Sequence, residues 1–181
     1  PHLIVRTSPW MELLEGAAGM KGVRRVTIGS GIRYDLLMVD PDRKVLLTEL
    51  VAHHVSGQLK IAPEHTVPSV LTAMRKTPVA DLEEFVRLYR VASAASGKKQ
   101  FLLPYLMACH PGCCIEDMHA MKREIFRIFG FIPRQVQSFI PLPLTLSSVI
   151  YLTGVDPLTG EHYPVERTQA KRQSQHRVFF A

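Results

Sequence analysis

The chain has 181 residues, which is enough for one domain or for part of a larger protein, and its hydrophobic content of 46% is ample for a buried core. The formal net charge of +6 is moderately basic, and a solvated surface explains such a surplus without nucleic-acid binding. No apolar run reaches the roughly 20 residues that a membrane-spanning helix needs, so we expect no membrane association.

The first predicted elements are a helix and a strand. Ser8 and Pro9 are typical of a helix start, because a hydroxyl caps the first turn and proline suits the first helical position, and Gly19 can close the helix. Alternating, β-branched residues predict a strand over Val23–Gly31.

A second helix is predicted to begin at Asp40 and to end at Gly57, with an apolar stripe of Leu46, Leu47, Leu50 and Val51. A short strand over Gln58–Ala62 follows it. Thr66 is then predicted to cap a third helix, which runs past Leu71.

The middle of the chain carries the clearest pattern. Asp81 is predicted to cap an amphipathic helix that ends before Gly97. The apolar run Phe101–Ala108 predicts a central strand, which stops at a Cys-His-Pro-Gly turn. A helix with an acidic first turn follows and is closed by Gly130.

A fourth strand is predicted over Gln135–Ile140, and Thr145 is predicted to cap a helix that stops at Gly154. The character of the chain changes from Val155 onward. Pro and Gly residues there predict a loop, and Val165–Phe180 is a polar, basic stretch that can form a helix. We therefore divide the chain into residues 1–154 and a loop with a basic tail, residues 155–181.

Helix and strand alternate four times, which predicts an α/β fold with about four parallel strands, either as an open sheet or as part of a barrel. Ligands in such folds are usually held at the carboxyl ends of the strands. The residues that we expect to gather there are Ser30, Arg33, Glu64, His65, Thr66, His110 and Pro141. Polar strand ends are also common for purely structural reasons.

Glu64 and His65 are candidates for an acid and a base, or for ribose-binding groups. The alternative is structural, with Glu64 in an ion pair with Arg33 or Lys60. Nothing in the sequence decides between these two interpretations.

Cysteine and histidine side chains of the kind that bind zinc occur together at Cys109, His110, Cys113 and Cys114. The adjacent Cys113 and Cys114 cannot easily both face one ion, and no CxxC pair is present. We therefore expect no metal at this loop and interpret Cys109 as a buried residue at the strand end. Neither GxxxxGK[ST] nor GxGxxG occurs.

The chain begins at Pro1 without a signal-peptide pattern, and its three cysteines do not resemble a secreted disulfide framework. We expect a cytoplasmic protein. Because no initiating methionine is present, we also expect a fragment, a processed product or half of a split gene.

Four stretches and a short motif after them resemble the YgiQ-type radical SAM proteins in order and spacing. They are Gly22–Leu37, Glu49–Thr66, Lys98–Gly112, Gln135–Thr145 and Tyr151–Gly154. The similarity covers nearly the whole chain, apart from a weak stretch around Val67–Ala80 and the last residues.

This resemblance implies that residues 1–154 are the later half of a radical SAM (β/α) barrel, which binds S-adenosylmethionine and a [4Fe–4S] cluster for 5′-deoxyadenosyl radical chemistry. The cluster ligands of the family lie in a CxxxCxxC loop after the first strand, and this chain has no such motif. The resemblance therefore implies a partner, the missing amino-terminal half of the barrel, and cluster ligands outside this chain. Without that half, the chain is expected to be inactive.

The resemblance also implies cofactor-binding positions. Ser30 and Arg33 would end one strand at the active face, and Glu64 and His65 would lie near the ribose or methionine portion of S-adenosylmethionine. The remaining positions, near the adenine, would be His110, Pro111, Gly112 and Pro141. Where the family usually has small or hydroxyl residues after HPG, this chain has Cys113 and Cys114.

Three other interpretations remain open at the level of sequence. The chain can be a non-catalytic remnant or an interaction segment of a truncated or split gene, whose exposed strand edge would favour pairing. It can be a nucleic-acid-binding module that uses the basic tail, although the net charge does not indicate one. It can also hold an unrelated metal site at Cys109–Cys114.

Overall fold

The computed structural model describes residues 5–180, which divide into two compact units. Among the described residues, unit 1 comprises residues 5–62 and 80–104, and unit 2 comprises residues 63–79 and 105–180. Two strands pass from one unit into the other, because the boundaries fall inside them. The division at residue 154 that the sequence suggests stays a prediction.

The strands form one parallel sheet in the order β1-β2-β3-β4. Their bounds are Gly31–Ile32 for β1, Gln58–Glu64 for β2, Phe101–Ala108 for β3 and Val136–Ser138 for β4. In unit 1, β1 pairs with β2, and Gly31 lies opposite Lys60. In unit 2, β3 pairs with β4, and Leu106 lies opposite Val136. The predicted α/β fold with four parallel strands is confirmed.

The helical elements of unit 1 are α1 (Ser8–Ala18), α2 (Tyr34–Met38), α3 (Arg43–Glu49), the π-helix η1 (Leu50–His54) and α5 (Val79–Ala95), whose first residue belongs to unit 2. The apolar stripe predicted for the second helix is buried, with Leu50 and Val51 wholly inaccessible. Phe85 of α5 packs against the ring of Tyr34 at 5.6 Å. These contacts form the core of unit 1.

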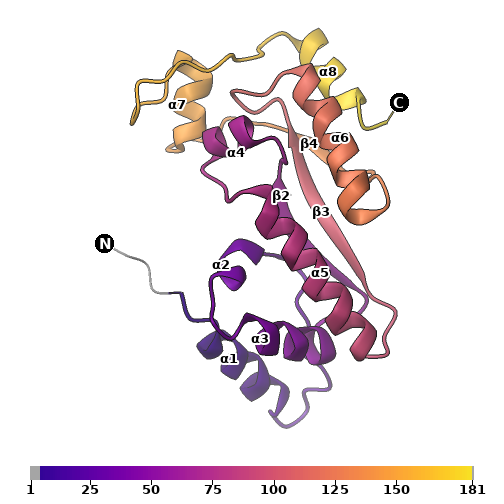
Figure 1. Cartoon of the computed structure of the whole chain (residues 1–181). Helices are drawn as coiled ribbons and strands as arrows, with labels where there is room; N and C mark the ends of the chain where they lie inside the picture. The colour runs from indigo at the N-terminus through magenta and orange to yellow at the C-terminus, as the bar shows by residue number, and fades with distance from the viewer. Residues whose placement is uncertain (1–4, 181) are drawn as a thin grey trace. The chain divides into compact units, whose positions relative to one another are not determined.

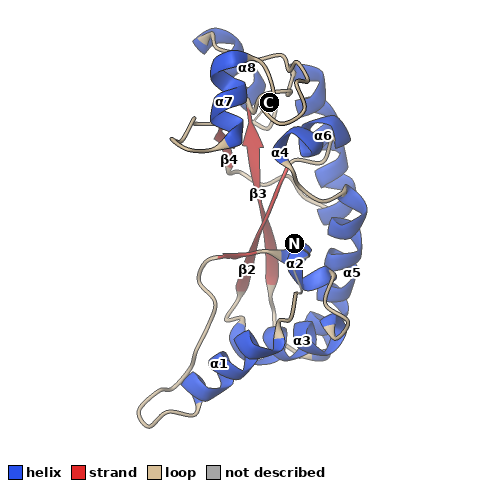
Figure 2. Ribbon diagram, turned by 90° about the vertical axis from the view of Figure 1, so that its left-hand side faces the viewer, coloured by secondary structure: helices blue, strands red, loops and turns tan. Residues whose placement is uncertain are grey.

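Several predictions in unit 1 are wrong. Ser8 does not cap α1, whose N-cap is Thr7, and Asp81 does not cap α5, which begins at Val79. The strand predicted over Val23–Gly31 exists only as Gly31–Ile32, and Figure 2 shows the preceding residues as a loop. Gly31 lies opposite Lys60, and β2 begins only at Gln58, so most of this segment has no residue of β2 opposite it with which to form a ladder. The helix expected from Asp40 begins at Arg43, because the Asp40 carboxylate accepts hydrogen bonds from the Asp42 and Thr7 backbone N–H groups.

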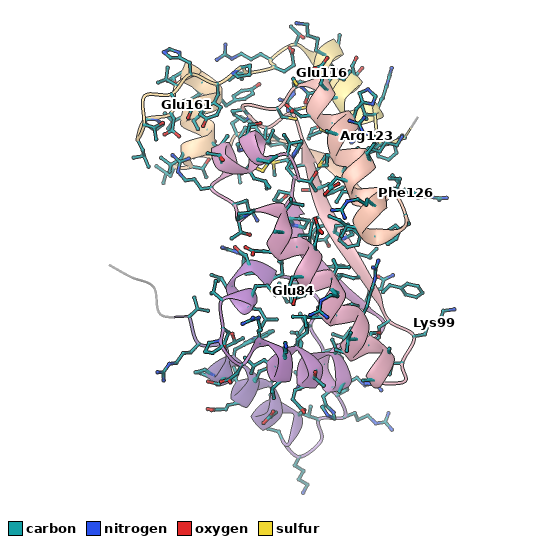
Figure 3. All side chains as sticks on the ribbon, in the orientation of Figure 1. Glu84, Lys99, Glu116, Arg123, Phe126 and Glu161 are labelled. Atoms are coloured by element: carbon teal, nitrogen blue, oxygen red, sulfur yellow. The ribbon has the colours of Figure 1, made fainter. Side chains whose placement is uncertain are left out.

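The helices of unit 2 are α4 (Pro68–Met74), α6 (Ile115–Phe129), α7 (Leu146–Thr153) and α8 (Gln169–Arg177). Helix α6 buries Met118, Met121 and Ile125, whereas Arg123 and Phe126 on the same helix are exposed (Figure 3). Helix α8 packs against α6 and β4 (Figure 1). The stretch predicted only as a basic tail therefore contains a helix that belongs to the core of this unit.

The helix caps predicted in unit 2 have mixed outcomes. Thr145 caps α7 by accepting a hydrogen bond from the Ser148 N–H, and Gly130 and Gly154 end α6 and α7 in the left-handed conformation, as predicted. Thr66 does not cap α4, whose N-cap is Val67. The Thr66 hydroxyl is instead buried without a hydrogen-bond partner.

The fourth strand is shorter than predicted, because the chain leaves the ladder after Ser138 and soon reaches Pro141, which has no N–H to donate. None of the helices in the described part of the chain has the length and apolar character that crossing a lipid bilayer requires.

Candidate functional site

Strands β2 and β3 end in the same way within unit 2. Glu64, the last residue of β2, and Cys109, the first residue after β3, have φ angles of 66° and 63°. A buried histidine follows each of them, His65 with 1% exposure and His110 with 3%. The left-handed conformation costs a non-glycine residue about 1–2 kcal/mol, so the surrounding contacts must hold both turns in place.

The His65 ring holds the first turn through both of its nitrogens. Nδ1 accepts a hydrogen bond from the Val67 N–H at 3.0 Å, so the proton of the neutral ring lies on Nε2. Nε2 lies 3.6 Å from Cys113 Sγ, which acts as the acceptor. Burial lowers the pKa of His65 to about 4, so the ring is neutral at pH 7. His65 therefore links the turn after β2 to the loop after β3.

The His110 ring carries its proton on the other nitrogen. Nδ1 lies 2.8 Å from the carbonyl oxygen of Pro111, which can only accept. Nε2 accepts a hydrogen bond from the Ser147 hydroxyl, also at 2.8 Å. Burial lowers the pKa of His110 to about 4 as well. The ring further contacts Phe139, edge to face, at 5.1 Å.

Both histidines thus use both ring nitrogens inside the protein. An imidazole in this state positions its turn and has no free lone pair or proton for a ligand. The predicted contact of His65 and His110 with a cofactor stays a prediction. The hydrogen bonds of the two rings explain directly how the turns after β2 and β3 are held in place.

Glu64 is the accessible titratable group of the β2 turn, with 23% of its side chain exposed. Burial raises the pKa of this carboxyl group, and Lys76, whose Nζ lies 3.9 Å from Oε1, opposes that shift. The structural alternative paired Glu64 with Arg33 or Lys60, whereas the structure shows an ion pair with Lys76, a residue that the sequence did not indicate. A carboxyl group in this position can accept hydrogen bonds from hydroxyl or amino groups of a ligand.

The cysteines after β3 are held as thiols. Burial raises the pKa of Cys113, and Asp117 adds to the shift. Cys114 donates to the Asp117 carboxylate at 3.0 Å, and its pKa is raised to about 11, mainly by burial. Cys109 is buried, as expected, and donates to the carbonyl of Arg172. Across residues 5–180, no three His, Cys, Asp or Glu side chains form a group that could hold a metal ion.

Gln175 of α8 closes this loop, although the sequence analysis did not single it out. Its Oε1 accepts a hydrogen bond from the Cys109 N–H, and its Nε2 donates to the Cys113 carbonyl, both at 3.0 Å. The side chain is buried. The only signal in the sequence was a polar residue within a basic stretch, which is indistinguishable from a surface residue.

Gly112 is required by its surroundings. Its φ angle is 87°, and a Cβ atom there would lie 3.0 Å from Cδ1 of Tyr163. Its N–H donates to the carbonyl of Pro164 at 2.8 Å. The loop before α8 therefore contacts the predicted cofactor-binding turn directly at Gly112.

The other predicted site residues are divided between the units. Glu64, His65, His110, Pro111, Gly112 and Pro141 all belong to unit 2. Ser30 and Arg33 belong to unit 1, where they line a cavity of about 570 Å³ together with Trp10. Arg33 is paired there with Asp35 at 2.6 Å. The gathering of all these residues at one edge stays a prediction.

The first prediction from this geometry concerns protonation. Unfolded histidines take up protons below about pH 6.5, whereas His65 and His110 in the folded chain stay neutral down to about pH 4. The unfolded state therefore binds more protons in this window. We expect each histidine to lower the free energy of unfolding by about 1.4 kcal/mol per pH unit as the pH falls from 6.5 toward 4, measured by urea denaturation.

Nitrogen NMR of the His65 and His110 rings measures their tautomers and their titration independently of stability. At pH 7, Nδ1 should be unprotonated in His65 and protonated in His110. Equal tautomers in the two residues, or titration of either ring near pH 6.5, would contradict the assignment.

The second prediction separates backbone strain from crowding at Gly112. Gly130→Ala places a Cβ on a residue with a φ of 80° and open space around it, so it should cost about 1–2 kcal/mol of unfolding free energy. Gly112→Ala adds the clash with Tyr163, so it should cost at least about 1 kcal/mol more. Equal losses for the two variants in urea denaturation would show that the Tyr163 contact is not tight.

Comparisons with known proteins give relatives but no matching family model. The chain is 44% identical over 166 residues to a UPF0313 protein of Clostridium perfringens, covering 92% of the chain and 25% of the relative. It is 44% identical over 163 residues to a UPF0313 protein of Geobacter sulfurreducens, covering 90% of the chain and 26% of the relative. A UPF0313 protein of Methanosarcina mazei is 41% identical over 175 residues, covering 97% of the chain and 27% of the relative.

The chain thus spans about a quarter of the length of the curated relatives that it matches. Along some nine-tenths of its own length, it is homologous to a segment of proteins named UPF0313.

Proposed function

We propose that this chain is the later half of a radical SAM (β/α) barrel, that it binds S-adenosylmethionine at the carboxyl ends of its strands, and that it acts in the cytoplasm. The observation that carries the proposal is the matched pair of strained turns after β2 and β3, each followed by a buried, neutral histidine. Strained turns at one edge of a parallel sheet are typical of ligand sites. The motif resemblance supports the same assignment, and the UPF0313 relatives, of which this chain spans about a quarter, support its being a segment of a longer protein.

The cysteines of this chain do not fit a [4Fe–4S] cluster. Cluster iron is held by thiolates, but the pKa of Cys113 is raised and that of Cys114 is raised to about 11. Cys109 and Cys114 are also engaged as hydrogen-bond donors to the Arg172 carbonyl and the Asp117 carboxylate. The cluster ligands of the proposed enzyme therefore belong to its amino-terminal half, which is the partner of this segment.

The residues of the β2 turn fit S-adenosylmethionine better. Glu64 has a partly exposed carboxyl group that can accept hydrogen bonds from ribose hydroxyls or from the amino group of the methionine portion. His65 acts through the turn, because its hydrogen bond to the Val67 N–H orients the backbone that follows Glu64. When bound and reductively cleaved, S-adenosylmethionine supplies the 5′-deoxyadenosyl radical.

Ser30 and Arg33 lie in unit 1, and the resemblance implies a cofactor-binding role for them as well. Ser30 is exposed, and the Arg33 guanidinium is held by Asp35 through three hydrogen bonds of 2.8, 3.2 and 2.6 Å. The pairing with Asp35 leaves Arg33 with donors that can still face a ligand.

The proposal is tested by equilibrium dialysis of radiolabelled S-adenosylmethionine against the reconstituted protein that joins this chain to its amino-terminal half. Glu64→Gln should weaken binding about tenfold, because it removes a charged acceptor. Glu124→Gln is the control, since Glu124 of α6 is about as exposed and is also ion-paired, with Arg127. Unchanged binding by Glu64→Gln, or equal losses in both variants, would overturn the assignment.

A further inference from the structure

Unit 2 contains a second cavity, of about 670 Å³, beside the end of β4 and the face of α8. Its lining includes three arginines and two aromatic rings, namely Arg167, Arg172, Arg177, Tyr151 and Phe139. Pro141, one of the predicted cofactor-binding residues, also lines it. His65, His110 and Glu64 do not, so the cavity is distinct from the turns described above.

The cavity carries a positive charge that no lining carboxylate offsets. None of its lining residues is Asp or Glu. The carboxylate of Glu166, next to Arg167 in the chain, is occupied by hydrogen bonds from Thr168 and by Lys171 at 3.6 Å. Arg177 is exposed. An anion entering the cavity therefore meets three arginine charges.

Two of these arginines are held in place by neutral groups. Arg167 donates to the carbonyls of Tyr151 and Leu152 at the end of α7, at 2.8 and 2.9 Å. Arg172 donates to the carbonyls of Phe139 and Glu166. Because a carbonyl fixes a guanidinium without cancelling its charge, both groups are pre-organised for an anion.

The half-buried ring of Tyr151 adds an aromatic surface next to this charge, whereas Phe139 is buried behind it. The guanidinium carbon of Arg172 lies 5.7 Å from the centroid of the Tyr151 ring, and that of Arg167 lies 6.0 Å away. Phe139 packs against Tyr151 at 5.7 Å. Planar guanidinium groups on an aromatic ring are surfaces on which a nucleobase can stack. The side-chain amides of Gln169 and Gln173, also in the lining, can bond to base edges or ribose hydroxyls.

The combination of three arginines, an aromatic surface and two side-chain amides favours some classes of ligand over others. S-adenosylmethionine carries a sulfonium cation, which three arginines disfavour, so the cavity does not suit the cofactor itself. A metal ion is disfavoured for the same reason. A phosphate group matches the arginines, and an attached nucleoside matches the rings and amides.

We propose that this cavity binds a nucleoside phosphate, supplied either as a free nucleotide or as a phosphate group within single-stranded RNA. The site lies beside the proposed cofactor edge through Pro141, but the binding itself does not depend on cofactor chemistry. It would place a phosphate-bearing substrate next to the segment that follows β4.

The test measures binding of adenosine 5′-monophosphate, of a labelled ten-nucleotide oligoadenylate RNA and of uncharged adenosine to the 181-residue chain. Arg177→Gln should weaken binding of the phosphate-bearing ligands about tenfold, because it removes a charge-assisted hydrogen bond. Arg177→Lys, which keeps the charge, should stay within about threefold. Arg123→Gln, an exposed arginine on α6 outside the cavity, should match the wild type.

A second variant tests whether a loss of binding reflects the charge of the cavity or a loss of folded structure. Gln173→Glu adds a carboxylate to the cavity and should weaken binding of both phosphate-bearing ligands while leaving the circular dichroism spectrum unchanged. If the monophosphate binds and displaces the RNA, the free nucleotide is the ligand. If only the RNA binds, and binding falls with salt, the ligand is single-stranded RNA.

Three results would overturn the proposal. They are adenosine binding as tightly as its monophosphate, an equal loss in Arg123→Gln, and no binding of any phosphate-bearing probe. Dialysis of S-adenosylmethionine with the Arg177→Gln form of the reconstituted protein should be unaffected. Failure of this inference is therefore distinguishable from failure of the cofactor assignment.

Discussion

The contact between His65 and Cys113 is the constraint on which the candidate site depends. It joins the turn after β2 to the loop after β3, and each of these turns contains a non-glycine residue in the left-handed conformation. Such residues are costly unless their neighbours hold them, and here the two buried histidines and Gln175 do so. Because the His65 ring must be neutral for Nδ1 to accept from the Val67 N–H, the shape of the site is tied to the burial that lowers the pKa of His65.

The segment after residue 154 belongs to this arrangement. Tyr163 packs close to Gly112, and the Pro164 carbonyl accepts a hydrogen bond from the Gly112 N–H. Gln175 forms hydrogen bonds with the Cys109 N–H and the Cys113 carbonyl, which lie on either side of His110 in the chain. The same segment supplies Arg167, Arg172 and Arg177 to the basic cavity. One short helix with its preceding loop thus supports two proposed sites in unit 2, the cofactor edge and the nucleoside phosphate site.

Much of the fold was predictable because its signals are local. The strand Phe101–Ala108 has the predicted bounds, and Gly130 and Gly154 end their helices as expected. The segment before Gly31 was mispredicted, since alternation reports only the side-chain period, whereas a strand also needs a neighbour with which to pair. Lys76 and Gln175 could not be found from sequence, because their partners, Glu64 and Cys109, are distant in the chain and are brought near only by the fold. The left-handed conformation of Glu64 and Cys109 likewise carries no signal in a residue other than glycine.

The most direct test of the central claim is anaerobic reconstitution with iron and sulfide, performed on this chain alone and together with the amino-terminal half. Cluster absorption and the release of 5′-deoxyadenosine from S-adenosylmethionine are followed in both samples. We predict that the two segments together form a cluster and cleave the cofactor, whereas the chain alone does neither, because its thiols are protonated and all three are hydrogen-bonded as donors. Cluster uptake by the chain alone, or failure of the two segments to cleave the cofactor, would contradict this prediction.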